Sequence, residues 1–145
     1  MKKYLPLMID LQNKKCLVVG GGKVAFRKVT TLLDYDARIV VVAPKVLPAL
    51  ESLAKKGRII VRKRKPRKSD LQNASLIFVA SSDRELNARI SEMANSAGVP
   101  VNVVDEPERC TFIMPAIFRR GMLQIAVSTT GGFPALAQKI RNKIF

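Results

Sequence analysis

Hydrophobic residues follow two periodic patterns along the chain. Five runs rich in β-branched or other apolar residues predict short buried strands, at 17–19, 39–42, 59–61, 76–80 and 101–104. Stretches between most of these runs repeat apolar residues every three to four positions, as at Ala25, Val29 and Leu32, which predicts amphipathic helices. The resulting order is strand, helix, strand, helix, strand, strand, helix, strand. This order predicts an α/β fold with a parallel sheet, helices on both faces and one crossover shortened to a loop.

The first predicted strand ends in three consecutive glycines. Gly20, Gly22 and Ala25 fit the pattern G-x-G-x-x-[GA], which is typical of dinucleotide-binding turns. Gly20 would allow the tight turn, Gly22 would let the backbone approach a pyrophosphate, and Ala25 would let the helix pack closely on the strand. The helix start would then direct backbone N–H groups at the phosphates. The sequence therefore predicts a Rossmann-like nucleotide site, with a plain glycine turn as the alternative.

The second predicted strand lacks a residue that many such sites use. An acid at its end usually binds the ribose hydroxyls, but this strand ends Val42-Ala43-Pro44-Lys45. The ribose must be held another way, or the phosphorylated cofactor is used. The residues alone leave NAD and NADP open.

The end of the chain has a different pattern. Apolar runs at 111–114 and 123–127 predict two strands joined near residues 119–121, followed by a helix that begins at Pro134. We expect residues 1–114 to form the Rossmann-like dinucleotide-binding domain and residues 115–145 a small β/α segment. Gly131-Gly132, just before the last helix, predicts either an anion-binding nest or a flexible turn.

Composition narrows the chemistry. The 145 residues contain no histidine, which excludes Ser-His-Asp and Cys-His catalysis and histidine-ligated zinc. The two cysteines, Cys16 and Cys110, lie far apart, which indicates a reduced cytoplasmic protein with two small packing residues. No apolar run reaches the roughly 18 residues that span a bilayer. We expect no metal site.

The net charge of +15 predicts an anionic partner. Nine of the cations crowd into residues 55–68, without an acid among them: Lys55, Lys56, Arg58, Arg62, Lys63, Arg64, Lys65, Arg67 and Lys68. Nucleic-acid binding is one interpretation, although the stretch holds no aromatic residue for base stacking. A solvated rim around the strand at 59–61 and attraction of a polyanionic small molecule are the others.

Polar residues follow the fourth and fifth predicted strands. Carboxyl ends of parallel strands line the ligand crevice, which places Ser81-Ser82-Asp83 and Asp105 there, with Asn102 inside the fifth strand. Asp105 is the best acid–base candidate because it would lie at the mouth beside the cofactor. The alternative is that Asp105 only caps the turn 105–107.

Several of these residues recur in one family pattern. They are Leu5-Pro6-Leu7, Val18 to Ala25, Val42-Ala43-Pro44, Ser82-Asp83, Asn87, Asn102-Val103-Val104-Asp105, Phe112-Ile113-Met114-Pro115-Ala116, Ala126-Val127-Ser128-Thr129 and Pro134-Ala135-Leu136-Ala137. With them the chain resembles, over essentially its whole length, the NAD-dependent precorrin-2 dehydrogenases of sirohaem synthesis. That family includes the N-terminal dehydrogenase and ferrochelatase module of multifunctional sirohaem synthase.

The resemblance implies roles for individual residues. It places Gly22, Lys23 and Val24 against the cofactor pyrophosphate, and Pro44 with Lys45 near the adenosine half. Asp105 matches the aspartate implicated in dehydrogenation and iron insertion, and Ser128 matches a serine of the tetrapyrrole pocket. We assign Ser82 and Asp83 to the cofactor, and Asn102 and Thr129 to the substrate.

The resemblance also implies a reaction and partners. The reaction is NAD-dependent oxidation of precorrin-2 to sirohydrochlorin, and the anionic tetrapyrrole suits a basic protein. The family forms dimers through the segment from about Pro115 onward, so we expect a homodimer. Relatives usually continue into a helical domain that helps cover the substrate. The chain is therefore expected to be either a natural short form or one that needs a separate helical partner to complete the site. Iron insertion, an NAD-sensing module without turnover and an RNA-binding protein remain alternatives.

Overall fold

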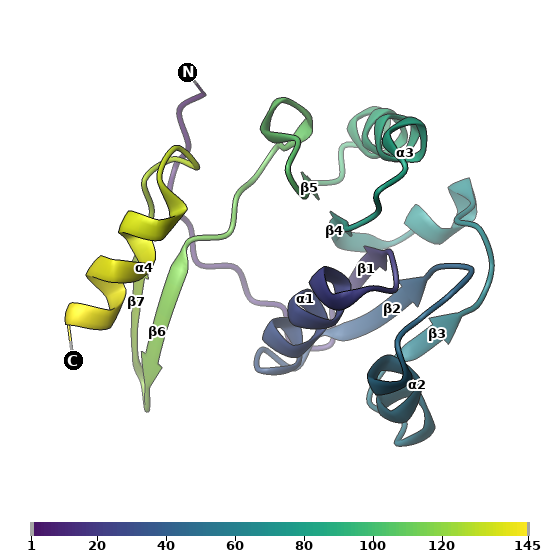
Figure 1. Ribbon diagram of the computed structural model, residues 1–145, viewed down its shortest axis with the longest axis horizontal. Coiled ribbons are helices and arrows are strands. Elements are labelled where there is room, and N and C mark those ends of the chain that lie inside the picture. The colour runs from purple at the N-terminus through teal and green to yellow at the C-terminus, as the bar shows by residue number, and fades with distance from the viewer. Residues whose placement is uncertain (1, 145) are drawn as a thin grey trace. The chain divides into compact units, whose positions relative to one another are not determined.

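The structure is a computed structural model and describes residues 2–144. The chain forms two compact units (Figure 1). The larger unit runs from Met8 to Thr111. The smaller unit joins the first residues, up to Leu7, with the chain from Phe112 onward. Within the described residues, no helix is long and apolar enough to cross a membrane.

The larger unit is built on a five-stranded parallel sheet, as the sequence predicts. Its spatial order is β3-β2-β1-β4-β5. The strands are β1 (Lys15–Val19), β2 (Arg38–Val42), β3 (Ile60–Arg62), β4 (Ala74–Val79) and β5 (Val101–Val103). The helices are α1 (Lys23–Leu33), α2 (Pro48–Lys55) and α3 (Arg84–Ser96), with short 3₁₀ turns η1 (Lys68–Leu71) and η2 (Pro107–Arg109). The expected short crossover, from β3 to β4, contains only η1.

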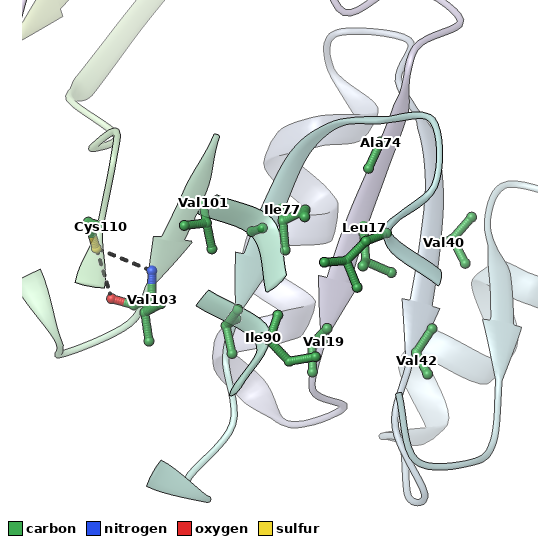
Figure 2. Packing of buried hydrophobic residues seen from close by; sticks show 13 residues of the cluster. Leu17, Val19, Val40, Val42, Ala74, Ile77, Ile90, Val101, Val103 and Cys110 are labelled. Carbon is green, nitrogen blue, oxygen red and sulfur yellow. Dashed lines mark hydrogen bonds between the residues drawn. The ribbon is translucent and has the colours of Figure 1, made fainter. Parts of the chain in front are cut away.

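Helices cover both faces of this sheet (Figure 1). Alternate strand residues point to opposite faces, so Leu17 and Ile77 share a buried cluster with Ile90 of α3 (Figure 2). On the opposite face, Phe78 is fully buried and the Lys28 ammonium of α1 lies 5.7 Å from its ring centre. The strands are therefore covered on both sides, which explains why they read as continuous apolar runs.

The third strand differs from the prediction of a buried strand at 59–61. Ile59 is buried, but β3 begins one residue later and Ile60 is 49% exposed. β3 is an edge strand, and among residues 2–144 it pairs with β2 alone, so less of it is shielded from water.

The smaller unit is a hairpin with a helix packed on it. Strands β6 (Ala116–Arg120) and β7 (Leu123–Val127) pair antiparallel, and α4 (Pro134–Lys143) contacts both. The prediction for β7 is confirmed, but the strand predicted at 111–114 is wrong, because β6 begins only at Ala116. Pro115 has no N–H to donate to a ladder, so pairing begins after it. Gly121, at φ 57°, takes the left-handed conformation that the hairpin turn needs.

Candidate functional site

A cleft of about 750 Å³ lies at the carboxyl ends of β1, β2, β4 and β5, within the Met8–Thr111 unit. Such an edge is where open parallel sheets bind ligands. It brings together most of the residues that the sequence predicts for a cofactor site. The lining includes Gly20, Gly22, Lys23, Val24, Pro44, Lys45, Ser82 and Asp105.

The glycine turn forms the floor of the cleft. Gly20 has φ +127°, and a Cβ there would lie 2.3 Å from the carbonyl oxygen of Ala80. Only glycine fits this position, because its φ is positive and because the residue that follows β4 approaches it closely. At Gly22 a Cβ would meet no atom within 4 Å, so the space that glycine leaves there is open.

Gly21 is a residue whose role the sequence does not reveal. A Cβ at this position would lie 2.1 Å from the Lys45 carbonyl oxygen. The Leu47 N–H donates to the Gly21 carbonyl at 2.8 Å. The turn after β1 thus packs directly on the turn after β2. The sequence gives one indication of this role: position 21 is a glycine although the dinucleotide-binding pattern accepts any residue there.

The start of α1 suits an anion. Gly22 is its N-cap and no side chain caps it, so the first-turn N–H groups keep their hydrogen-bonding capacity. The side chains of Lys23 and Lys45 supply positive charge at the same cleft, and the end of β2 contributes no acid. Open space at Gly22, an uncapped helix start and two lysines together fit a dinucleotide diphosphate.

Asp105 is the acidic residue among those that line the cleft. It is exposed and has φ +61°, a left-handed conformation that aspartate tolerates better than most residues. Within residues 2–144 no hydrogen bond or ion pair engages its carboxylate. The carboxylate is therefore available to a ligand and does not cap the turn.

Asp83 has a different environment from Asp105. Its carboxylate accepts from the Leu86 N–H at 3.1 Å and caps α3, and the residue does not line the cleft. Asp83 therefore differs from the expectation that it lies in the crevice with Ser81 and Ser82. Ser82 and Ser81 do line the cleft, immediately after β4.

The residues assigned to the substrate lie elsewhere. Asn102 is 8% exposed inside β5, and its amide lies 3.7 Å from the Cys110 sulfur. Ser128 and Thr129 belong to the smaller unit, in the turn before α4. There the Ser128 hydroxyl accepts from the Thr130 N–H and the Thr129 hydroxyl from the Phe133 N–H, both at 3.1 Å.

Part of the basic stretch surrounds a buried carboxylate. Asp70 is fully buried and accepts from Arg62 and Arg64 at 2.7 Å, and from the Arg67 N–H at 2.8 Å. The Arg64 hydrogen bonds, followed by those of Arg67 and Arg62, hold the pKa of Asp70 far below its usual range despite burial. The interpretation of a merely solvated rim is therefore wrong for Arg62 and Arg64. Pro66, in the same stretch, lines the cleft.

No group of three or more His, Cys, Asp or Glu side chains that could hold a metal ion occurs among residues 2–144. Both cysteines are buried and neither forms a disulfide, and burial raises the pKa of the Cys16 thiol to about 11. Neither cysteine lines the cleft.

Two protein-family models match the chain. One, described as "Putative NAD(P)-binding", covers residues 7–116, and the other, "Sirohaem biosynthesis protein central", covers residues 120–144. Curated relatives include a siroheme synthase of Ectopseudomonas mendocina, 47% identical over 142 residues, and one of Nitrosomonas europaea, 42% identical over 142 residues. The matches cover 98% and 97% of this chain but 30% of each relative, so the chain spans less than a third of their length.

A solved structure matches both units. It is titled "SirC, precorrin-2 dehydrogenase", with a TM-score of 0.82 and 32% sequence identity, and the match covers 97% of this chain and 69% of that one. The expected Rossmann-like fold is thereby confirmed.

Proposed function

The chain belongs to the NAD(P)-binding family of the precorrin-2 dehydrogenases and siroheme synthases, and from this premise we propose that it oxidises precorrin-2 to sirohydrochlorin with NAD. The observation that carries the proposal is the cleft that combines an open glycine turn with one unpaired carboxylate. The first feature suits a dinucleotide, and the second suits proton transfer beside it.

The residues at the end of β1 would hold the cofactor. The N–H groups of Gly22, Lys23 and Val24 would bind the diphosphate, with the Lys23 ammonium adding charge. Pro44 and Lys45 would lie along the adenosine half, and Ser82 on the opposite wall. A bound nicotinamide ring supplies a hydride acceptor.

Asp105 would take the proton. The oxidation removes two hydrogens from the tetrapyrrole, one as a hydride and one as a proton. The Asp105 carboxylate, open to the cleft and free of other partners, would accept the proton as the hydride leaves. Extended conjugation of the product supplies the driving force, so the protein mainly orients the reactants.

The choice of NAD over NADP rests on the family resemblance. The end of β2 offers Lys45 where a ribose-binding acid commonly stands, so it presents no carboxylate that would repel a 2′-phosphate. Titration of both dinucleotides into the same sample tests the choice, and we expect tighter binding of NAD.

The smaller unit has features that suit a homodimer interface and contact with the substrate. It exposes Phe133, Leu136 and Ile140 by 70%, 48% and 41%, an apolar surface that a second copy would cover. We propose that Ser128 and Thr129 contact the tetrapyrrole from this unit, and that Asn102 acts on the substrate side from within β5. A cytoplasmic location fits two buried thiols that form no disulfide.

The test is turnover of anaerobically prepared precorrin-2, followed by absorbance, beside an NAD titration. We expect sirohydrochlorin at a catalytic rate from the wild-type chain. Asp105→Asn should lower kcat about a hundredfold or more, with NAD affinity within about twofold of wild type. The matched control is Asp36→Asn, because Asp36 is also exposed and left-handed, with φ 53°, but does not line the cleft.

Each other outcome has a defined meaning. NAD binding without turnover would favour a sensing module or an absent partner. Failure to bind either dinucleotide would contradict the assignment of the glycine turn. Full activity of Asp105→Asn would remove its role as the base and leave the dehydrogenase assignment intact.

A further inference from the structure

A single buried amide connects two loops of the cleft. Asn87, in the first turns of α3, is 2% exposed. Its Nδ2 donates to the Ser81 carbonyl at 3.0 Å and to the Glu106 carboxylate at 2.8 Å. Ser81 lines the cleft after β4, and Glu106 directly follows Asp105 after β5. The amide thus bridges the loop that follows β4 and the loop that follows β5.

The chemistry of the neighbours fixes the orientation of this amide. A backbone carbonyl and a carboxylate are both acceptors, so only an NH₂ group satisfies the two together. The Asn87 Oδ1 is left buried and without a partner. An aspartate of the same shape would place acceptor against acceptor at both contacts, so the position requires the donor and not merely the volume.

Glu106 is held from its other side as well. It is 8% exposed, and its second oxygen accepts from the Arg109 Nε at 2.7 Å. The hydrogen bond from Asn87, and then the contact with Arg109, lowers the pKa of Glu106. The side chain is therefore a fixed charged link between α3 and η2.

Two further contacts fix the ends of the same loop. The Val104 N–H donates to the Val79 carbonyl at 2.9 Å. The buried Cys110 sulfur lies 3.2 Å from both the nitrogen and the carbonyl oxygen of Val103 (Figure 2). Asp105, with its φ of +61°, thus stands between two anchored neighbours.

We propose that Asn87 and Glu106 are positioning residues that hold the Asp105 carboxylate at the mouth of the cleft, opposite the Ser81–Ser82 wall. The inference rests on the proposed role of Asp105 as the proton acceptor. The link acts through the backbone of residue 106, so it should govern the chemical step and leave dinucleotide binding at the glycine turn unchanged.

The experiment uses the full chain and begins with Glu106→Gln. This variant keeps the shape of the side chain, but its one amide oxygen cannot accept from both Asn87 and Arg109. We expect kcat to fall about tenfold, with KM for NAD within about twofold of wild type. Amide hydrogen exchange at residues 104–106 should quicken, while exchange in β1 stays the same. Thr111→Val is the control, because it removes a comparable 2.8 Å bond to Val101 at the far end of β5.

A pair of exchanged variants separates positioning from general stability. Asn87→Asp should be less active than Glu106→Gln, since it faces two acceptors. The double variant N87D/E106Q restores a donor–acceptor pair between the two positions, and we expect it to recover part of the kcat lost in Asn87→Asp.

The results separate this inference from the proposed function. If Asp105→Asn is inactive while Glu106→Gln keeps full kcat, or if kcat falls no further than in Thr111→Val, the inference is overturned. Unchanged exchange at residues 104–106 in Glu106→Gln would overturn it without reference to activity. Full turnover by Asp105→Asn would instead overturn the role of Asp105, and the inference with it.

Discussion

The two units differ sharply in what they bury. In the Met8–Thr111 unit, a five-stranded sheet and three helices enclose fully buried side chains such as Leu17, Ile77 and Phe78. In the smaller unit, Ala137 is the one apolar residue among those described that is buried, while Met122, Phe133 and Leu136 are largely exposed. The first unit carries its own core and the cleft. The second unit exposes apolar side chains, which contribute to stability only when another surface covers them.

The largest expected effect concerns Asp70, which belongs to the self-contained unit. Asp70→Asn should destabilise the chain by about 3–5 kcal/mol at pH 7, because it removes the charge that Arg62 and Arg64 enclose. Urea unfolding measures the change. Asp36→Asn, at an exposed aspartate, should alter stability by less than about 0.5 kcal/mol.

The same variant predicts a pH dependence. The folded pKa of Asp70 is lowered, so its stabilisation is complete above the unfolded pKa of about 3.9 and is lost as the pH falls further. The gap in unfolding free energy between wild type and Asp70→Asn should therefore narrow between pH 5 and pH 3. A constant gap across that interval would contradict the ion-pair explanation.

A matched pair of truncations probes the contrast in burial directly. Ile77→Ala empties a site that is 0% exposed and should cost about 3 kcal/mol of unfolding free energy. Ile140→Ala, at a side chain that is 41% exposed, should cost less than about 0.5 kcal/mol in a dilute sample. Equal costs at low protein concentration would break the comparison between the units.

Glycine substitutions test function against structure across the two units. In Gly22→Ala the added Cβ meets no atom within 4 Å, so the free energy of unfolding should change by less than about 1 kcal/mol. Dinucleotide affinity should fall about tenfold, because the Cβ occupies the space open to the diphosphate. Gly132→Ala makes one ordinary 3.5 Å contact in the smaller unit and should leave affinity unchanged. Calorimetric titration measures both. Full affinity in Gly22→Ala would place the diphosphate elsewhere.

The smallest effect on unfolding should come with the clearest effect on association. Leu136→Ser with Ile140→Ser exchanges exposed apolar side chains of α4 for polar ones, at a cost below about 0.5 kcal/mol each. If a second copy covers this surface, sedimentation should show a lower dimer fraction than in the wild type. An unchanged dimer fraction would place the interface away from α4.

The sequence predicts well what depends on local pattern. The strand ends, the glycine turn and the approach of Asp105 to the cleft follow from periodicity and from the rule that parallel strands align their carboxyl ends. The burial of Asp70 does not follow from the sequence, because its partners Arg62 and Arg64 lie eight and six positions away and reach it only in the folded chain. The hydrogen bond from Asn87 to Glu106 joins residues 19 positions apart, and no periodic pattern in the sequence predicts it. β6 begins later than the apolar run at 111–114 predicts, because Pro115 has no N–H to donate to the ladder.

The strand order has a consequence for how the chain folds during synthesis. β1 pairs on one side with β2 and on the other with β4, with Val19 opposite Val79. The side of the cleft that β4 contributes therefore cannot form beside the glycine turn until β4 has left the ribosome. Contacts between segments so distant along the chain form slowly. Until then, one edge of β1 stays open and the nucleotide has no complete cleft to enter, so the cofactor stabilises the finished unit and cannot guide its early folding.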